Sequence, residues 1–225
     1  VKAADAEKEY DGTVLTNDGW SVEAATKDTG LVGTDRIGSV KVTGSQLYPG
    51  NSANVPSEAT FASGNANNYQ VSYTNGTLKV NGRTVKYVIT ANAADGEYTY
   101  DGTPKTAEGV TYDNLTFGGQ TYKVEGLSSS RTETNVDSER TGYVTTIVGT
   151  AIVTDKDGHD VTEQFEVDTT DTGLLMINPR PVTVKAADAE KEYDGTVLTN
   201  DGWSVEAATK DTGLVGTDRI GSVKV

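Results

Sequence analysis

The chain has no cysteine and a single histidine, His159, among its 225 residues. Without cysteine no disulfide can form, so a secreted chain of this composition depends on other means of stabilisation. Zinc sites need three or four nitrogen or sulfur ligands, which one histidine does not supply. A Ser-His-Asp triad would rest on His159 alone, a residue that the other copies of the surrounding repeat lack. We therefore predict no catalytic residues and no enzymatic activity.

Residues that favour helices and membrane spans are also scarce. Methionine occurs once, and no stretch approaches the roughly 20 apolar residues of a membrane-spanning helix. Glycine is frequent, at 25 positions, and tyrosine, at 11, is the leading aromatic residue. This composition favours short strands joined by tight turns over helices.

Basic residues are fewer than acidic residues. The 33 acidic residues exceed the 19 basic ones and give a formal net charge of −14. Such a surface repels phosphate backbones and anionic lipid head groups, so we predict neither a nucleic-acid partner nor membrane insertion within this sequence. The acids lie mostly in turns rather than beside aromatic clefts, which disfavours a glycosidase carboxylate pair.

What the sequence does contain is repetition. Residues 1–42 recur without a change at residues 184–225. A globular enzyme has no use for a repeated half of itself. In a tandem array each module needs contact only with its neighbours, so repetition of this kind predicts an array.

A shorter period lies within the longer one. The tripeptide Tyr-Asp-Gly, followed each time by threonine, occurs three times, at spacings of 90 and 93 residues. These copies are the structural motif residues of our prediction: Tyr10, Asp11, Gly12, Tyr100, Asp101, Gly102, Tyr193, Asp194 and Gly195. The long repeat therefore contains two diverged modules, each of a size common among small all-β domains.

A second landmark closes each module, because residues 76–83 align with residues 173–180. The predicted domains are a first repeat module, a diverged second module and the N-terminal half of a third, at residues 1–82, 83–180 and 181–225. Linkers of only two or three residues favour a semi-rigid rod, in which neighbouring repeats are each other's partners.

The first module is predicted to contain seven short strands, from alternation and β-branched content, at residues 1–4, 9–13, 20–24, 36–42, 55–61, 69–74 and 77–81. Asn75-Gly76 predicts a type I′ turn between the last two strands. We expect an all-β fold of tandem Ig-like antiparallel β-sandwich modules. The alternative is a β-grasp-like module whose helix is formed by residues 3–9, the one place where a helical turn is plausible.

The third module has only half of this strand set. Half a sandwich cannot bury its apolar face. We predict that residues 182–225 either complete a module across a chain boundary or superpose on residues 1–42 with an open face.

Several motifs carry a family resemblance. Residues 8–13, 42–46, 67–69 and 73–78, with their counterparts at 99–102, 157–162 and 173–177, resemble the YDG/MBG-type repeats of large bacterial surface proteins. The likeness covers essentially the whole chain, although the second module departs from it at Pro104 and over residues 128–140. The resemblance implies a non-catalytic stalk or spacer in an extracellular, cell-wall-attached adhesin of a Gram-positive bacterium. Its motifs are turn and strand signatures and identify no ligand.

Two other functions remain open. One is a module that binds a host glycan or protein through exposed tyrosine or tryptophan, and the other is an accessory module of a large extracellular enzyme. For Tyr-Asp-Gly-Thr we favour a structural turn, with aspartate accepting backbone N–H bonds, glycine at positive φ and tyrosine over the core. For Trp20 and Trp203 we favour core packing over stacking on a sugar.

A calcium site is the one cofactor hypothesis. Oxygen ligands alternate around a glycine in the segment that contains Asp155, Asp157, Asp160 and Glu163. The glycine comes too early for an EF-hand, and one ligand position is lysine or histidine. A polar hairpin without a metal is the favoured interpretation.

Overall fold

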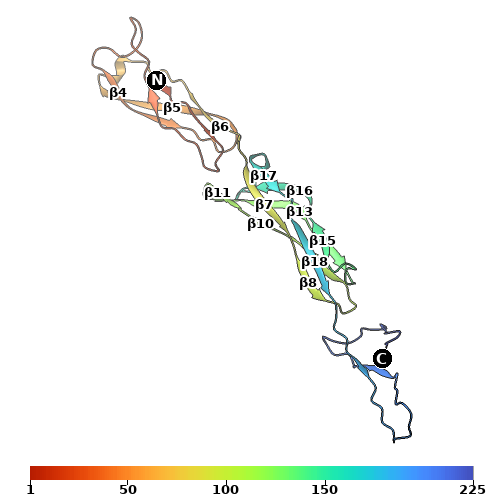
Figure 1. Ribbon diagram of the computed structural model, residues 1–225. Helices are drawn as coiled ribbons and strands as arrows, with labels where there is room; N and C mark the ends of the chain where they lie inside the picture. Colours follow the sequence, from red (N-terminus) through yellow and green to blue (C-terminus); the bar gives the residue numbers. More distant parts are fainter. Residues whose placement is uncertain (225) are drawn as a thin grey trace. The chain divides into compact units, whose positions relative to one another are not determined.

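The structure, a computed structural model, describes residues 1–224 and consists almost entirely of strands and loops (Figure 1). Two three-residue 3-10 turns, η1 (Ala66–Asn68) and η2 (Thr162–Gln164), are the only helical elements in this range. The all-β class expected from the sequence is confirmed. Over the same residues, no helix has the length and apolar character needed to cross a membrane.

The chain forms two compact units. The first contains Val1–Ile89, Asn114–Glu125 and Ala151–Val167, and the second contains Thr90–Asp113, Gly126–Thr150 and the chain from Asp168 onward. Each unit therefore combines residues from two adjacent repeats. Each unit therefore contains contacts between one repeat and the next.

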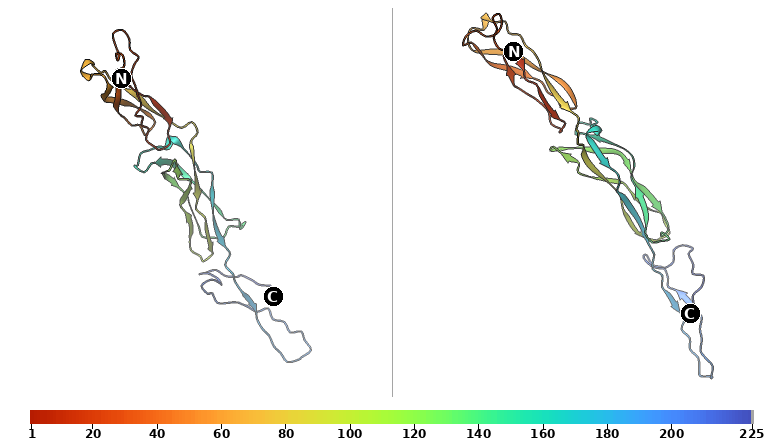
Figure 2. Two further views of the ribbon diagram at one scale, coloured as in Figure 1. Left: turned by 90° about the vertical axis from the view of Figure 1, so that its left-hand side faces the viewer. Right: turned by 45° about the horizontal axis from the view of Figure 1, so that its top comes forward.

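In the first repeat, a four-stranded sheet has the order β2-β6-β5-β4, and β1 pairs with β3. The strands are β1 (Lys2–Ala3), β2 (Ala6–Glu9), β3 (Trp20–Ser21), β4 (Arg36–Thr43), β5 (Gly50–Ser63) and β6 (Gly76–Asn81). In β6, Gly76, Leu78 and Val80 are buried and the residues between them are exposed or half-buried, as expected for a strand with one face on a core. Three views show β4 and β5 side by side (Figures 1 and 2).

Three local expectations were wrong. Residues 3–9 form strands rather than a helical turn, because β2 pairs in parallel with β6, in the register Ala6↔Leu78 to Glu9↔Asn81. Residues 10–13, expected as strand, form a turn. The expected strand at 69–74 is reduced to a single bridge between Lys2 and Thr74.

The predicted type I′ turn at Asn75-Gly76 is also wrong, because neither residue has the positive φ that this turn needs. Gly76 instead starts β6. A Cβ atom there would overlap the backbone carbonyl oxygen of Ala4. Glycine at this position allows close approach of two backbone segments.

The second repeat reuses the same parallel pairing. Strand β8 (Gly96–Thr99) pairs in parallel with β18 (Thr172–Asn178) from Leu175↔Gly96 to Asn178↔Thr99. The remaining strands are β7 (Tyr87–Ala93), β9 (Lys105–Glu108), β10 (Val110–Asp113), β11 (Thr116–Phe117), β12 (Gln120–Thr121), β13 (Lys123–Ser128), β14 (Ser130–Glu133), β15 (Tyr143–Thr146), β16 (Val148–Thr154) and β17 (Phe165–Asp168).

The two parallel pairs also have equivalent side-chain hydrogen bonds. The Asp5 carboxylate accepts the Thr77 backbone N–H at 2.7 Å, and the Asp95 carboxylate accepts that of Leu174 at 2.7 Å. In the second unit, Ala107, Leu175 and Ile177 form a core against which Tyr100, Val136 and Tyr143 pack. The sequence repeat is therefore also a structural repeat.

The third copy has the sequence of the first without its partner strands. Within its described residues, up to 224, the third copy forms only β19 (Val184–Ala186) and β20 (Trp203–Val205), which pair with each other as β1 and β3 do. The rest of the described copy is drawn as open loops (Figure 2). Its apolar side chains include the exposed Tyr193, Val197 and Leu198.

Candidate functional site at the repeat junctions

The Tyr-Asp-Gly-Thr segment forms a closed polar turn. Asp11 Oδ1 accepts the Thr13 backbone N–H at 2.9 Å and the Thr13 hydroxyl at 2.7 Å, and the Lys8 ammonium donates to it at 2.7 Å. Gly12 has a φ of 78°, which L side chains adopt only with strain. Although partial burial raises the Asp11 pKa, the bonds from Lys8 and Thr13 outweigh it and leave the pKa lowered.

The same turn forms in the other two copies. Asp101 and Asp194 each accept the N–H and hydroxyl of the threonine two residues later, and Gly102 and Gly195 have φ values of 81° and 78°. A hydrogen bond from Lys105 lowers the pKa of Asp101, and one from Lys191 lowers the pKa of Asp194 to about 2. The turn is therefore a local structure that forms whether or not the rest of a module is present.

The tyrosine that opens the motif depends on its surroundings. The Tyr10 backbone N–H bonds to the Asn81 carbonyl at 2.9 Å, and the Tyr100 N–H bonds to that of Asn178 at 2.9 Å, which places both rings at the end of a parallel pair. Tyr10 is 1% exposed, and burial raises its pKa. In the third copy Tyr193 is 97% exposed.

Beside the first turn, Arg83 connects the closing strand to the next repeat. Its Nη1 donates to the Tyr10 carbonyl at 3.1 Å, and its Nε donates to the Val85 carbonyl at 2.8 Å. The guanidinium lies 3.8 Å from the centre of the Tyr87 ring, within the range of a cation–π contact. The Arg83 backbone N–H also donates to the Gln164 side chain at 2.8 Å.

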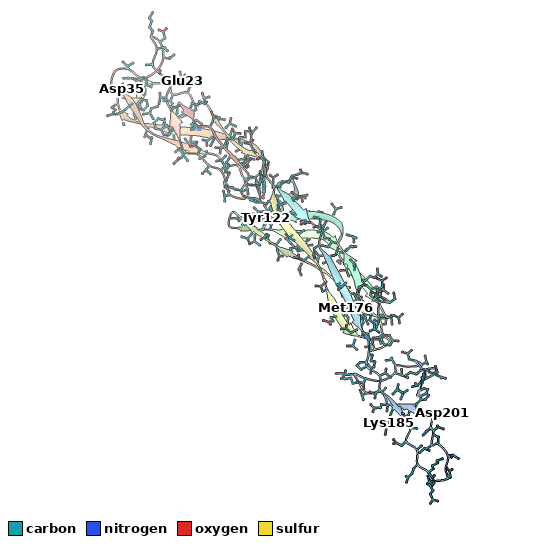
Figure 3. The ribbon with its side chains drawn as sticks, viewed as in Figure 1. Glu23, Asp35, Tyr122, Met176, Lys185 and Asp201 are labelled. Atoms are coloured by element: carbon teal, nitrogen blue, oxygen red, sulfur yellow. The ribbon has the colours of Figure 1, made fainter. Side chains whose placement is uncertain are left out.

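An aromatic cluster continues this junction. Tyr87 stacks on Phe117 with ring centres 4.5 Å apart, and Phe165 lies 5.6 Å from Phe117 and 4.7 Å from Tyr122. Tyr122, labelled in Figure 3, is buried, and its hydroxyl has no hydrogen-bond partner among the described residues. A Cβ atom on Gly12 would overlap that hydroxyl. The turn of the first repeat therefore packs directly against the aromatic cluster of the second.

A second contact lies on the Tyr48 side of the same unit. The Tyr48 hydroxyl donates to the Asp155 carboxylate at 2.7 Å and lies 2.6 Å from His159 Nδ1. Burial and the hydrogen bond to Asp155 raise the pKa of Tyr48 to about 12. The sole histidine thus belongs to a junction contact.

Three of the four carboxylates of the calcium hypothesis, those of Asp155, Asp157 and Asp160, have separate partners. Besides Tyr48, Asp155 accepts the backbone N–H groups of Asp157 and His159. Asp160 accepts the N–H and hydroxyl of Thr162, and Asp157 pairs with Lys156. Glu163 lies in the first turn of η2. Over residues 1–224, no group of three or more His, Asp or Glu side chains is arranged to hold a metal ion.

The second junction, inside the second unit, has a different chemistry. Arg180, the counterpart of Arg83, donates to backbone carbonyls of the loop at residues 209–213 of the third copy. A Cβ atom on Gly102 would lie 2.7 Å from Val215 Cγ1, and the Tyr100 hydroxyl donates to Asp218 at 3.2 Å. In both junctions, the turn glycine faces the following repeat.

The two tryptophans are half-buried, Trp20 in β3 and Trp203 in β20. In each copy the tryptophan belongs to the strand that pairs with the first strand of the repeat. Comparison of the chain with models of known protein families, with curated proteins and with solved structures found no match.

The sequence did not reveal the roles of Arg83 and Arg180, which are the last residues of the aligned segments 76–83 and 173–180. An arginine at the same place after each closing strand was a usable signal, because interrepeat contacts recur with the repeat. Tyr48, Tyr122 and Phe165 carried no comparable signal.

Proposed function

We propose that this chain is a region of non-catalytic spacer repeats, built as tandem Ig-like sandwiches, in an extracellular bacterial surface protein or adhesin. The observation that carries the proposal is the recurrence of one junction plan. After each closing strand an arginine contacts the following repeat, Arg83 through the Val85 carbonyl and the Tyr87 ring and Arg180 through the loop at residues 209–213, and the Tyr-Asp-Gly turn packs against that repeat. A region whose repeated side chains join repeats suits a role in setting distance.

The extracellular, cell-wall-attached location rests on the resemblance of the Tyr-Asp-Gly-Thr and closing-strand motifs to bacterial surface repeats. The composition is compatible with it, because a chain without cysteine does not depend on disulfide formation after export. In this proposal the chain extends a binding tip away from the wall, and the neighbouring repeats are its main partners.

Small-angle scattering of the full chain tests the proposal. A compact globule of this length has a radius of gyration of about 17 Å, and an unfolded chain about 52 Å. We expect a value well above the first and below the second, with an asymmetric distance distribution. A value near 17 Å would show that the repeats fold back on each other and would refute the spacer role.

Exposed tyrosines favour a second candidate, a glycan- or host-protein-binding module. Tyr73 is 42% exposed and Tyr98 is 38% exposed. Both hydroxyls already have internal partners, since Tyr73 accepts the Ala59 N–H and Tyr98 donates to the Thr106 carbonyl. A glycan array with the wild-type chain and the Tyr73→Ala and Tyr98→Ala variants discriminates. Binding that either substitution abolishes would support the second candidate, and absence of binding would favour the spacer.

A further inference from the structure

The loop that receives Arg180 is a set of backbone carbonyls arranged around one guanidinium. Arg180 Nε donates to the Gly213 carbonyl at 2.9 Å, and Nη2 lies 2.8, 3.0 and 3.1 Å from the carbonyl oxygens of Thr209, Lys210 and Thr212. The Gly213 N–H donates to the Pro181 carbonyl at 2.8 Å. We call these four carbonyls and the loop that carries them, residues 209–213, the arginine cradle.

The first repeat contains the same loop, at residues 26–30, with the same internal bonds. The Thr26 N–H donates to the Thr29 carbonyl at 2.7 Å, and its counterpart in the cradle measures 2.9 Å. The two threonine hydroxyls are 2.7 Å apart in one loop and 2.8 Å in the other. Gly30 and Gly213 have φ values of 99° and 91°. The loop thus has one shape with or without a guanidinium, so its carbonyls are preorganised.

The surroundings of the two loops differ in exposure. Gly213 is buried beneath Arg180 and Pro181, whereas Gly30 is exposed. Val215 lies against Gly102, whereas its counterpart Val32 is 72% exposed.

Beside the loop of the first repeat is a surface depression of about 570 Å³, whose lining includes Glu23, Asp28, Thr29 and Gly30. Glu23 and Asp35 lie at this end of the repeat in Figure 3. The two carboxylates in the lining, Glu23 and Asp28, complement a positive charge.

We propose that the loop at residues 26–30 is a docking site for the closing segment of another repeat of the second type, which carries the sequence Asn-Pro-Arg-Pro of residues 178–181. The arginine of that segment donates to the carbonyls of Thr26, Lys27, Thr29 and Gly30, and the following proline carbonyl accepts the Gly30 N–H. The partner is thus a second copy of this chain's own repeat end. The inference rests on the proposed function, since its partner is a repeat in an array.

The site is selective for one kind of repeat end. Arg83 follows Asn-Gly rather than Asn-Pro, and it lies on the Tyr87 ring and the Tyr10 carbonyl. The second repeat has an aromatic cluster at its junction, built on Phe117 and Tyr122, where the first and third copies have the carbonyl loop. Two junction chemistries therefore alternate along the array, and a cradle receives only the end of a second-type repeat.

The test joins a copy of residues 174–183 in front of Val1, so that the added threonine precedes Val1 as Thr183 precedes Val184. The full chain is kept and arginine is labelled with ¹⁵N. Charge-assisted bonds of this kind slow exchange of the Nε proton at least ~10-fold relative to free arginine. We expect slow exchange for Arg83 and Arg180 in the unextended chain, because both Nε protons are hydrogen-bonded, and for one further arginine in the extended chain. Replacing the added arginine by alanine should remove only the added signal.

Two control proteins accompany the extended chain. Arg180→Ala in the unextended chain should abolish the slow signal assigned to Arg180, which fixes the signature of an occupied cradle. A second extension, built from residues 77–86 with the Arg83 type of end, retains only the local bond of Arg83 Nε to the Val85 carbonyl and should slow exchange less than the first extension does. Free-arginine exchange at the added residue, beside a protected Arg180, would overturn the proposal. Equal protection of the added arginine in both extensions would also overturn the proposal. Neither result alters the scattering test of the unextended chain, so the spacer role stands or falls separately.

Discussion

Tyr10 and Tyr193 occupy the same position in two identical 42-residue segments, yet Tyr10 is 1% exposed and Tyr193 is 97% exposed. Their local chains do not explain the difference, because the following Asp-Gly-Thr turn has the same hydrogen bonds in both. Two neighbours of Tyr10 are missing around Tyr193: β6, which pairs with β2 and accepts the Tyr10 N–H at Asn81, and the second repeat, whose Tyr122 lies beside Tyr10. Burial of the motif tyrosine is therefore controlled by residues about 70 or more positions away in the sequence.

Gly12→Ala is expected to destabilise the first unit more than an ordinary glycine substitution at positive φ. Backbone strain alone costs about 1–2 kcal/mol, and overlap of the new methyl with the Tyr122 hydroxyl adds roughly 1–3 kcal/mol. Tyr122 has little freedom to move, because it is buried against Phe165. Urea unfolding measures the loss.

The matched control is Gly158→Ala. Gly158 has a φ of 83°, and a Cβ atom there meets nothing within 4 Å, so only the strain remains. Tyr122→Phe removes the overlapping oxygen and should restore part of the stability lost in Gly12→Ala. Equal losses in the two alanine variants would show that Gly12 does not contact the next repeat.

Local chemistry explains what the sequence predicted well. The Tyr-Asp-Gly-Thr turn uses partners within five residues, so aspartate at the first turn position and glycine after it were sufficient signals. The misplaced elements are those fixed from far away. Residues 6–9 are a strand because of β6, and Gly76 is a glycine because the Ala4 carbonyl lies against it. No pattern within ten residues contains that information.

The contacts at the junctions could not be predicted from the sequence for the same reason. Arg83 and Arg180 occupy equivalent places, but one binds an aromatic face and the other a carbonyl loop. That difference depends on the following repeat, which has Tyr87 in one case and residues 209–213 in the other. The position of the two arginines in the sequence gives no information about these partners, which depend on the fold.

Asp101→Asn is expected to reduce the pH dependence of stability. The pKa of Asp101 in the folded chain is lowered, first by the hydrogen bond from Lys105 and then by those from Thr103. With an unfolded pKa of about 3.9, the contribution of Asp101 to stability is present above about pH 4 and is lost as the pH falls below it. The variant should be less stable than the wild type at pH 7 and lose less on acidification to about pH 2.

Calorimetric unfolding at several pH values between 7 and 2 provides the measurement. Asp18→Asn serves as control, because Asp18 is exposed and makes no described ion pair. It should keep the wild-type pH profile. If Asp101→Asn also kept that profile, the Lys105 pair would contribute nothing to folding.

Arg83→Lys is expected to destabilise the first unit by about 1–2 kcal/mol, although the charge is retained. Lysine has no planar group to lie on Tyr87 and cannot donate to the Tyr10 and Val85 carbonyls in the fixed geometry of a guanidinium. Arg36→Lys, on exposed β4, is the matched control and should be nearly neutral. Equal urea midpoints for the two variants would show that the Arg83 side chain does not stabilise the junction.

Completing the third copy should lower the exposure of Tyr193. Extending the chain after Val225 with a copy of residues 43–82 supplies the counterparts of β5 and β6, including the closing asparagine that accepts the motif tyrosine's N–H. Val197 and Leu198 should lose exposure at the same time, because apolar burial stabilises the completed module by ~25 cal/mol per Å².

Tyrosine nitration followed by trypsin and mass spectrometry reports the change. Tyr10 and Tyr193 lie in tryptic peptides of identical sequence, residues 9–27 and 192–210, so their signals pool. The unextended chain should give about half of this peptide nitrated, since one tyrosine of the two is buried, and the extended chain should give a clearly smaller fraction. A fraction that stays at one half would show that the strands of residues 43–82 do not complete the third copy.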